Sequence, residues 1–463
     1  MGSYELIKED PRNEGIGDVK ANGGRDRYDD ASDVELALRK SQSPSLCATD
    51  GRARNKGKAV PAANARLVSL DVFRGLTVAL MILVDDAGGI VPAINHSPWN
   101  GLTLADFVMP FFLFIVGLSL GLANKNFSCR VGATKKAISR AVKLLILGLF
   151  LQGGYFHGLR TLTYGVDIKH IRWMGTLQRI AIAYMVSAVC EIWLKGDDGK
   201  CDIGHMEEDE HLNPHIGEKR HVVLMEGNFI EFIDGKAVAL ALTAIYLSLL
   251  YGLYVPDWNY QVKCGLRGDT GPSCNAVGMI DRKILGIQHL YNRPIYSRTK
   301  QCSINSPDYG PLPPDAPSWC RAPFDPEGLL SSVMAIVTCL IGLHYGHIIV
   351  HLKDHRSRLS QWMIASFGLV LFGVVFDFSG MHINKALYTV SYVCVTAGAA
   401  GILFAGIYVL VDMYGYKRSI MVLEWMGMNA LLIYILIACN ILPVILQGFY
   451  WGRPQNNIVS ISI

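Results

Sequence analysis

Long apolar runs, separated by short polar segments, dominate the chain from residue 66 onward. Because a helix needs about 20 apolar residues to cross the hydrocarbon core of a bilayer, each run of that length predicts one transmembrane helix. Nine such runs are present, at residues 67–87, 104–123, 137–156, 172–194, 237–256, 328–351, 361–378, 386–412 and 420–439. The pattern therefore predicts an all-α polytopic membrane protein, built as a bundle of about nine transmembrane helices.

The two ends of the chain depart from this pattern. The first 65 residues are rich in Gly, Asp, Arg, Lys and Ser and cannot bury a core, so we expect a disordered tail. The apolar stretch 441–451 is too short to span and contains Pro443, so we expect it to lie at the membrane interface. The predicted organisation is a tail at 1–65, a transmembrane domain at 66–440 and a C-terminal tail at 441–463.

The composition indicates a membrane protein and argues against nucleic acid as a partner. Hydrophobic residues make up 51% of the 463 residues and charged residues only 18%. A mean hydropathy of +0.27 is too apolar for an ordinary soluble chain of this length, so the excess must face a lipid bilayer. The net charge is only +4, so nucleic acid is not an expected partner.

Positive charge is concentrated in the short loops. Five basic residues come just before the first apolar run: Arg52, Arg54, Lys56, Lys58 and Arg66. Because cytosolic loops are enriched in Lys and Arg, this cluster predicts a cytosolic N-terminus. Alternation then places the basic clusters at 125–136, 353–358 and 417–418 on the same side, and the C-terminus in the lumen.

The same alternation places the long loop 257–327 on the lumenal or extracellular face. This loop contains four of the 11 cysteines, which are Cys264, Cys274, Cys302 and Cys320. Because that compartment is oxidising, we expect two disulfides to staple the loop. Three pairings of the four cysteines stay open.

The cytosolic loop 195–235 contains four histidines, which are His205, His211, His215 and His221. Their spacing is not that of a compact metal site. We therefore favour a solvated, mobile loop over metal binding and expect no metal cofactor.

Ionisable side chains inside a span are costly unless they face a polar cavity, so they are candidates for function. In the first run, Asp71, Arg74 and Asp85 lie within about 60° of one another on a helix, which makes a polar stripe across the membrane. The structural alternative stays open. In that reading Asp71 and Arg74 form an ion pair at one interface and Asp85 is an interfacial acid at the other.

The turn after the first run brings an imidazole close to an acidic helix end. Asn95-His96-Ser97-Pro98-Trp99-Asn100 leads into a span whose third residue is Asp106. This arrangement suits the removal of a proton from an incoming amine or hydroxyl group. The alternative is a solvated loop histidine with no chemical role.

These residues also carry a resemblance to a known family. The stretch Arg66-Leu-Val-Ser-Leu-Asp-Val-Phe-Arg-Gly-Leu and the segment from His96 to Asp106 closely resemble the heparan-α-glucosaminide N-acetyltransferase family of transmembrane enzymes. Further motifs follow in the family's order, up to about residue 438: Gln178-Arg179, Ile280-Asp281-Arg282, His289-Leu290-Tyr291, Asp325-Pro326-Glu327-Gly328, Asn384-Lys385, Ser391-Tyr392 and Gly427-Met428-Asn429. An ordered series is more specific than any single motif.

The resemblance implies an enzyme that passes an acetyl group from cytosolic acetyl-CoA, its co-substrate, to an amine on the lumenal side. The family's active histidine falls on His96, which is expected to act as a base or as an acetyl carrier. The family's asparagine near the thioester falls on Asp85, a departure that leaves its role open. We expect the Asp85 carboxylate to lie beside the imidazole and raise its pKa, so that Asp85→Asn lowers the pH optimum. Arg74 and Asp71 are expected to meet the CoA, and site support is expected from Asn100, Asp106, Arg179 and Asn429.

Several alternatives stay open. Arg74 is either a phosphate ligand or only the partner of Asp71, and Arg179 either binds the acceptor or, as we favour, pairs with a first-span acid. The family's lumenal N-terminal domain and final span have no counterpart here, so a catalytically inactive truncated relative is one alternative to the enzyme. A multi-span transporter is another, but no two halves with matching broken helices are evident.

The remaining expectations concern surroundings and partners. The acceptor is a small-molecule or glycan amine of amino-sugar type, which the sequence does not identify further. A homodimer is compatible with the sequence. The expected location is a lysosome- or vacuole-type endomembrane or the plasma membrane.

Overall fold

The computed structural model describes residues 67–88, 91, 94–123, 130–151, 169–194, 235–258, 264–291, 294–416 and 420–439. The predicted tails at 1–65 and 441–463, and the four histidines of the loop after residue 194, lie outside these residues. Within the described residues the structure is helical and has no β-strand, and Asn100 pairs with Asn384 in an isolated β-bridge.

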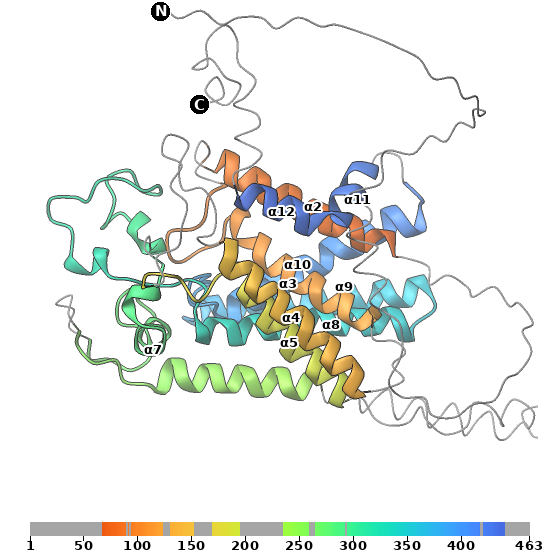
Figure 1. Cartoon of the computed structure of the whole chain (residues 1–463), viewed down its shortest axis with the longest axis horizontal. Coiled ribbons are helices and arrows are strands. Elements are labelled where there is room, and N and C mark those ends of the chain that lie inside the picture. Colours follow the sequence, from red (N-terminus) through yellow and green to blue (C-terminus); the bar gives the residue numbers. More distant parts are fainter. Residues whose placement is uncertain are drawn as a thin grey trace, which may run out of the picture. The chain divides into compact units, whose positions relative to one another are not determined.

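The apolar runs fold into helices, and each run except the last forms one long helix (Figure 1). In chain order these are α2 (Val68–Ala87), α3 (Leu104–Ala123), α4 (Arg130–Leu151), α5 (Thr176–Leu194), an unlabelled helix (Gly235–Gly252), α8 (Leu329–His351), α9 (His355–Phe378), α10 (Val390–Tyr408), α11 (Met421–Met428) and α12 (Ala430–Ala438). A π-helical turn, η4 (Val409–Met413), continues α10.

Each of the nine predicted runs overlaps one of these helices or, for the last run, a pair. In the described part of the chain, six helices are long and apolar enough to cross a membrane, and α11 with α12 would make a seventh across a 73° bend. The other two, α2 and α4, have a helix of 20 and 22 residues but carry more charged side chains. The predicted all-helical, multi-pass fold class is confirmed.

The helix pair α3 and α8 forms the centre of the packing. A Cβ atom at Gly117 would lie 1.9 Å from the carbonyl oxygen of Cys339, and one at Gly342 would lie 2.1 Å from that of Phe114. Glycine at these two positions lets the backbones touch, which is how helices associate closely where lipid removes the hydrophobic driving force.

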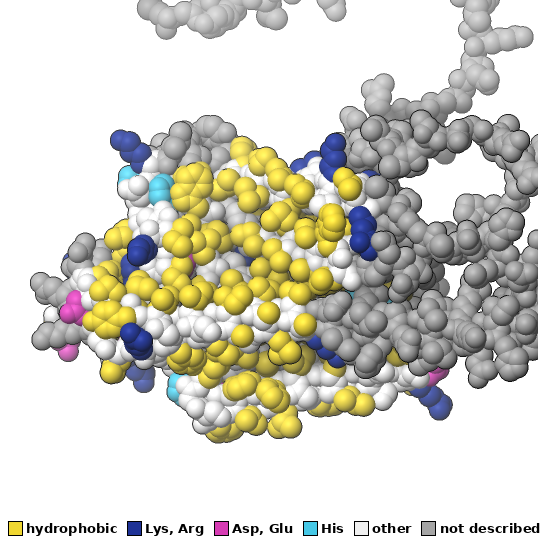
Figure 2. All heavy atoms as spheres, turned by 90° about the horizontal axis from the view of Figure 1, so that it is seen from below, with side chains coloured by type: hydrophobic (Ala, Val, Ile, Leu, Met, Phe, Trp, Pro, Cys, Tyr) yellow, Lys and Arg dark blue, Asp and Glu magenta, His cyan; other side chains and the backbone are white. Residues whose placement is uncertain are grey.

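Two helices lie at the periphery of the bundle. In the most apolar windows of α9 and of the helix Gly235–Gly252, only 17% and 11% of residues are buried, against 72% in α3. The outer face of α9 exposes Ile364, Phe367, Leu371 and Phe372. Figure 2 shows a face on which hydrophobic side chains cover much of the surface, with Lys and Arg mainly toward its margins. Such a surface suits contact with lipid rather than water.

The segment between Gly252 and α8 contains a short helix, α7 (Ala276–Ile284), and two disulfides. Cys264 is bonded to Cys274 and Cys302 to Cys320, so the pairing is between neighbours along the chain. The predicted disulfide-containing loop is confirmed, and one of its three pairings is selected.

Aromatic contacts fix this loop to the turn before α3. The ring of Trp99 packs edge to face against Phe324 at 5.5 Å and Tyr296 at 5.9 Å. Its indole N–H donates a hydrogen bond of 3.1 Å to the carbonyl oxygen of Thr270. Because Trp99 lies three residues after His96, the disulfide loop restrains the turn that carries the histidine.

Candidate functional site

A cavity of about 750 Å³ lies between α2, α3, α5, α10 and the α11–α12 pair. Its walls include four residues predicted from the sequence, which are Arg74, Asp85, His96 and Arg179. Arg74 lies near the start of α2 and Asp85 near its end, about 16 Å farther along the helix. The cavity therefore extends along most of α2 and reaches the turn that carries His96.

Asp106 is fully buried in the first turn of α3 and holds the preceding turn in place. Its Oδ2 atom accepts hydrogen bonds from the backbone N–H of Ser97 at 3.2 Å, and from the N–H and hydroxyl of Thr103 at 3.1 and 2.9 Å. Its Oδ1 atom lies 2.8 Å from Nδ1 of His96. One carboxylate thus fixes both the backbone of the turn and the orientation of the imidazole.

A lysine from a distant part of the chain joins this pair. The Nζ atom of Lys385 lies 2.8 Å from Nδ1 and 3.3 Å from Nε2 of His96, and 3.5 Å from Oδ1 of Asp106. A neutral imidazole has one N–H and one bare nitrogen. When Nδ1–H donates to Asp106, Nε2 is the bare nitrogen, and both Lys385 and the cavity lie beside the ring.

Two asparagines join the turn of Lys385 to the turn before α3. The side-chain amide of Asn384 donates to Oδ1 of Asn100 at 3.1 Å, and the N–H of Gly101 donates to the carbonyl oxygen of Ile383 at 2.9 Å. Asn100, predicted as site support, does not line the cavity. It holds the two turns that place the histidine and the lysine side by side.

The surroundings of His96 set its charge. Burial lowers the pKa of His96 and the Lys385 ammonium lowers it further, while the hydrogen bond to Asp106 raises it less. Burial also lowers the pKa of Lys385, against the opposing effect of Asp106 and Glu327. His96 is therefore neutral at neutral pH and offers the bare ring nitrogen that a general base needs.

A second charged cluster borders the cavity just before α5. Arg172 donates hydrogen bonds to both oxygens of Asp325 at 2.8 and 2.5 Å, and to Glu327 at 2.8 Å. The hydroxyl of Thr176 donates to Glu327 at 2.9 Å. Burial alone would lower the pKa of Arg172, but the two carboxylates raise it above its usual range. The guanidinium stays charged, and it also lies 4.7 Å from the ring centre of Tyr291.

Arg179 has other partners than the first-span acid that the sequence led us to favour. Its Nη2 donates to the carbonyl oxygen of Pro326 at 2.7 Å and to the hydroxyl of Ser331 at 2.5 Å. The guanidinium lies 5.1 Å from the ring centre of Tyr388. Arg179 therefore joins α5 to the start of α8 and supports the cavity wall.

Arg74 is paired with Asp71 and also lines the cavity. Its Nη1 lies 3.2 Å from Oδ1 of Asp71 and 3.4 Å from the carbonyl oxygen of Gly427, and its Nη2 donates to the hydroxyl of Ser119 at 3.2 Å. Asp71 is buried and is not part of the cavity lining. The ion pair thus holds an arginine that still lines the cavity.

Asn429, the last predicted residue, lies at the break between α11 and α12. Its side chain donates to the carbonyl oxygen of Trp425 at 3.0 Å, and the residues on either side of it line the cavity. A Cβ atom at the nearby Gly427 would lie 1.8 Å from the carbonyl oxygen of Asp71, so α11 touches the backbone of α2. Asn429 shapes the wall of the cavity rather than lining it.

Asp85 lines the cavity, but we expected its carboxylate beside the imidazole, and the carboxylate that contacts His96 is Asp106. Both acids are about ten residues from the histidine, so sequence distance did not separate them. Lys385 was missed as a site residue because 289 residues separate it from His96. Its one sequence signal was its place in the motif Asn384-Lys385.

Comparison with known proteins supports the resemblance drawn from the sequence. A family model described as heparan-alpha-glucosaminide N-acetyltransferase, catalytic, matches residues 66–195. The chain is 29% identical over 388 residues to heparan-alpha-glucosaminide N-acetyltransferase of Mus musculus, which is 80% of this chain and 53% of the mouse protein. It is 27% identical over 387 residues to the Homo sapiens protein of the same name, covering 80% of this chain and 52% of the human protein.

The predicted resemblance to this family is confirmed by these matches. The chain spans about half the length of the two curated relatives. The matched segment 66–195 contains His96, Asp106 and Arg74, and it ends before Lys385.

Proposed function

We propose that this chain is a membrane-embedded acetyltransferase, which moves an acetyl group from acetyl-CoA on the cytosolic side to an amino-sugar amine on the lumenal side. The observation that carries the proposal is the position of His96, held by Asp106 at 2.8 Å on the wall of a cavity that extends to Arg74. The names of the two relatives supply the type of reaction.

The cavity suits acetyl-CoA as the donor. The stretch of wall between Arg74 and His96 includes the apolar side chains of Met81, Phe112 and Ile115, against which a pantetheine arm would pack. A guanidinium is a good partner for a phosphate because it offers several fixed N–H donors. Arg74 would therefore receive the phosphates at one end, and the thioester would lie near His96 at the other.

In the proposed reaction Nε2 of His96 takes a proton from the acceptor amine. The amine nitrogen forms a bond to the thioester carbonyl carbon, and the carbon–sulfur bond then breaks. The imidazolium returns its proton to the departing thiolate, so that the products are an acetamide and free CoA. Asp106 accepts the hydrogen bond of Nδ1–H throughout and stabilises the imidazolium that forms.

Lys385 adds an electrostatic contribution in this scheme. Its Nζ atom lies 2.8 Å from Nδ1 and 3.3 Å from Nε2 of His96, beside the ring at which the acceptor and the thioester are proposed to meet. A fixed positive charge at this position stabilises the negative oxygen of the tetrahedral intermediate. The same charge lowers the pKa of His96 and so keeps the base unprotonated.

His96 could instead take the acetyl group itself before passing it on. We favour direct transfer, because an amine made neutral by a nearby base is already nucleophilic enough to attack a thioester. Radiolabelled acetyl-CoA, supplied without acceptor, distinguishes the two routes. Label bound covalently to His96, and then passed to acceptor, would establish the carrier route.

The test of the function uses the purified full chain in sealed proteoliposomes. Labelled acetyl-CoA is supplied on one side and a panel of amino sugars on the other. Acetylated amino sugar that appears only when both are present supports the transferase. Uptake of a labelled amino sugar in unchanged form, without acetylation, would instead support a transporter and contradict the proposal.

A further inference from the structure

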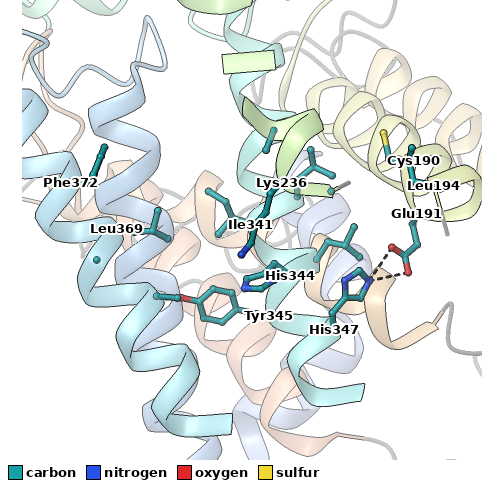
Figure 3. Close-up of a pocket in the computed structure, with 16 residues that line it drawn as sticks. Cys190, Glu191, Leu194, Lys236, Ile341, His344, Tyr345, His347, Leu369 and Phe372 are labelled. Atoms are coloured by element: carbon teal, nitrogen blue, oxygen red, sulfur yellow. Dashed lines mark hydrogen bonds and ion pairs between the residues drawn. The ribbon is translucent and has the colours of Figure 1, made fainter. Parts of the chain in front are cut away.

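A second cavity, of about 420 Å³, lies on another side of the bundle and shares no lining residue with the first. It is formed by α5, the helix Gly235–Gly252, α8 and α9 (Figure 3). All four helices are long and apolar enough to cross a membrane. Its volume lies in the range of about 300–1,000 Å³ that is usual for small-molecule sites.

The greater part of this cavity is apolar. Leu369 and Phe372 of α9 face Ile341 of α8 across it (Figure 3). Phe372 is 61% exposed and stands at the outer edge, beside the lipid-facing surface of α9. A cavity of this composition, bordered by the exposed apolar side chains of α9, suits an acyl chain and disfavours a water-soluble solute.

Polar side chains lie together at one end. Both carboxylate oxygens of Glu191 lie 3.0 Å from Nε2 of His347. Lys236 extends toward His344 (Figure 3). Among the described residues that line the cavity, Glu191 is the one acidic residue. Lys236 also lies in the first turn of its helix, where the helix dipole favours negative charge. This end of the cavity therefore favours an anionic group.

We propose that the cavity binds one anionic phospholipid of the surrounding membrane, with an acyl chain between α8 and α9 and its phosphate beside Lys236 and His344. The negative headgroup of the lipid matches the basic end of the cavity, and the acyl chain next to it matches the apolar part. The site is independent of the acetyl-transfer cavity, so neither proposal depends on the other.

Two substitutions separate the contributions of charge and of space. Lys236→Gln removes the ammonium but keeps a polar side chain of similar length. Gly368→Phe fills the cavity, because Gly368 lines it and a Cβ atom there would meet nothing within 4 Å. Lys353→Gln is the charge control, an exposed lysine just after the same end of α8. Gly406→Phe is the matched space control, in equally open surroundings but outside this cavity.

The experiment reconstitutes the full chain in equal parts of phosphatidylcholine and phosphatidic acid and measures retained lipid by native mass spectrometry. Thermal melting checks that each variant is folded. The wild-type protein should retain phosphatidic acid in preference to phosphatidylcholine. Lys236→Gln should reduce that preference about fivefold, the usual worth of one basic residue near a lipid headgroup.

Gly368→Phe should lose the retained phosphatidic acid, and the two control variants should match the wild type. Equal retention of the two lipids by the wild-type protein would overturn the proposal. So would a folded Lys236→Gln or Gly368→Phe protein with unchanged retention, since the lipid would then bind elsewhere.

Discussion

The Nδ1 atom of His96 and the Oδ1 atom of Asp106 lie 2.8 Å apart, although one belongs to a turn and the other to the first turn of α3. The second oxygen of the same carboxylate accepts three hydrogen bonds from the residues between them. Because these contacts also fix the turn, the imidazole is oriented before any substrate arrives. Orientation of this kind is what an efficient general base requires.

Asp106→Asn should reduce acetyl transfer by roughly two to four powers of ten, because the amide cannot stabilise a positive imidazolium. Asp106 raises the pKa of His96, so its loss should move the acidic limb of the kcat/KM profile to lower pH. The profile is measured with the purified protein across the acidic and neutral range.

Asp85→Asn is the matched control for this change. We expected from the sequence that it would lower the pH optimum, but the carboxylate that contacts His96 is Asp106. Asp85→Asn should therefore keep substantial activity and leave the acidic limb unmoved. If Asp85→Asn shifted the acidic limb and Asp106→Asn did not, Asp85 would be the acid that sets the pKa of His96, and the role given to Asp106 would be wrong.

Lys385→Gln should move the same limb in the opposite direction. The ammonium lowers the pKa of His96, so its removal raises that pKa and protonates the base at a higher pH. The acidic limb of kcat/KM should then lie at higher pH than in the wild type, with turnover also reduced because a charge near the reacting oxygen is lost. Lys300→Gln, an exposed lysine of the disulfide loop, should have neither effect. An unchanged profile for Lys385→Gln would remove its charge from the mechanism.

Asp281 should make stability depend on pH. Burial raises the pKa of this carboxyl to about 7, although the N–H of Leu329 donates to it at 2.8 Å. The folded protein therefore binds this proton more tightly than the unfolded chain does. Its stabilising contribution is complete below the usual pKa near 4 and is lost as pH rises toward 7, a change on the order of a few kcal/mol.

The Tm of the purified protein, measured at intervals from acidic to neutral pH, reports this dependence. Asp281→Asn should flatten the fall in Tm over that range, whereas Asp315→Asn at an exposed site of the same loop should not. If the Asp281→Asn protein loses Tm with pH as steeply as the wild type, another group is responsible.

The two disulfides should stabilise the loop unequally. Cys302 and Cys320 are 18 residues apart, whereas Cys264 and Cys274 are 10 apart. Closing the longer loop removes more freedom from the unfolded chain, so loss of the 302–320 bond should cost about 3 kcal/mol and more than loss of the other. The measurement is the Tm of each double Cys→Ser variant. Peptide mapping that links Cys264 to Cys302 or Cys320 would contradict the pairing.

The helices could be predicted because the bilayer sets their length. Two details could not. The helix α4 begins at Arg130, before the predicted start at 137, because basic side chains extend a helix without lengthening its apolar run. The last run, 420–439, is bent by 73° at Asn429 although its apolar content is continuous. Close backbone contact at Gly427 fixes α11 against α2, and hydropathy does not register such contacts.

Only those parts of the site that lie close together in the sequence could be predicted. His96 and Arg74 could be identified because they belong to one helix and the turn that follows it. Lys385 and Arg172 form their contacts only when distant parts of the chain fold together. Lys385 contacts His96, which is 289 residues away in the sequence, and Arg172 contacts Asp325, which is 153 residues away. Sequence spacing does not report such distances, and only the short motifs around these residues pointed to them.

The most direct test of the proposed chemistry is the rate of acetyl transfer by His96→Ala, measured with labelled acetyl-CoA beside His382→Ala. His382 is an exposed histidine on the connection before Lys385, so its loss controls for a general effect of removing an imidazole. His96→Ala should reduce turnover by roughly two to four powers of ten, and CoA binding should survive because Arg74 lies at the other end of the cavity. The His382→Ala protein should keep wild-type turnover. A folded His96→Ala protein that transfers acetyl groups at the wild-type rate would contradict a role for this histidine.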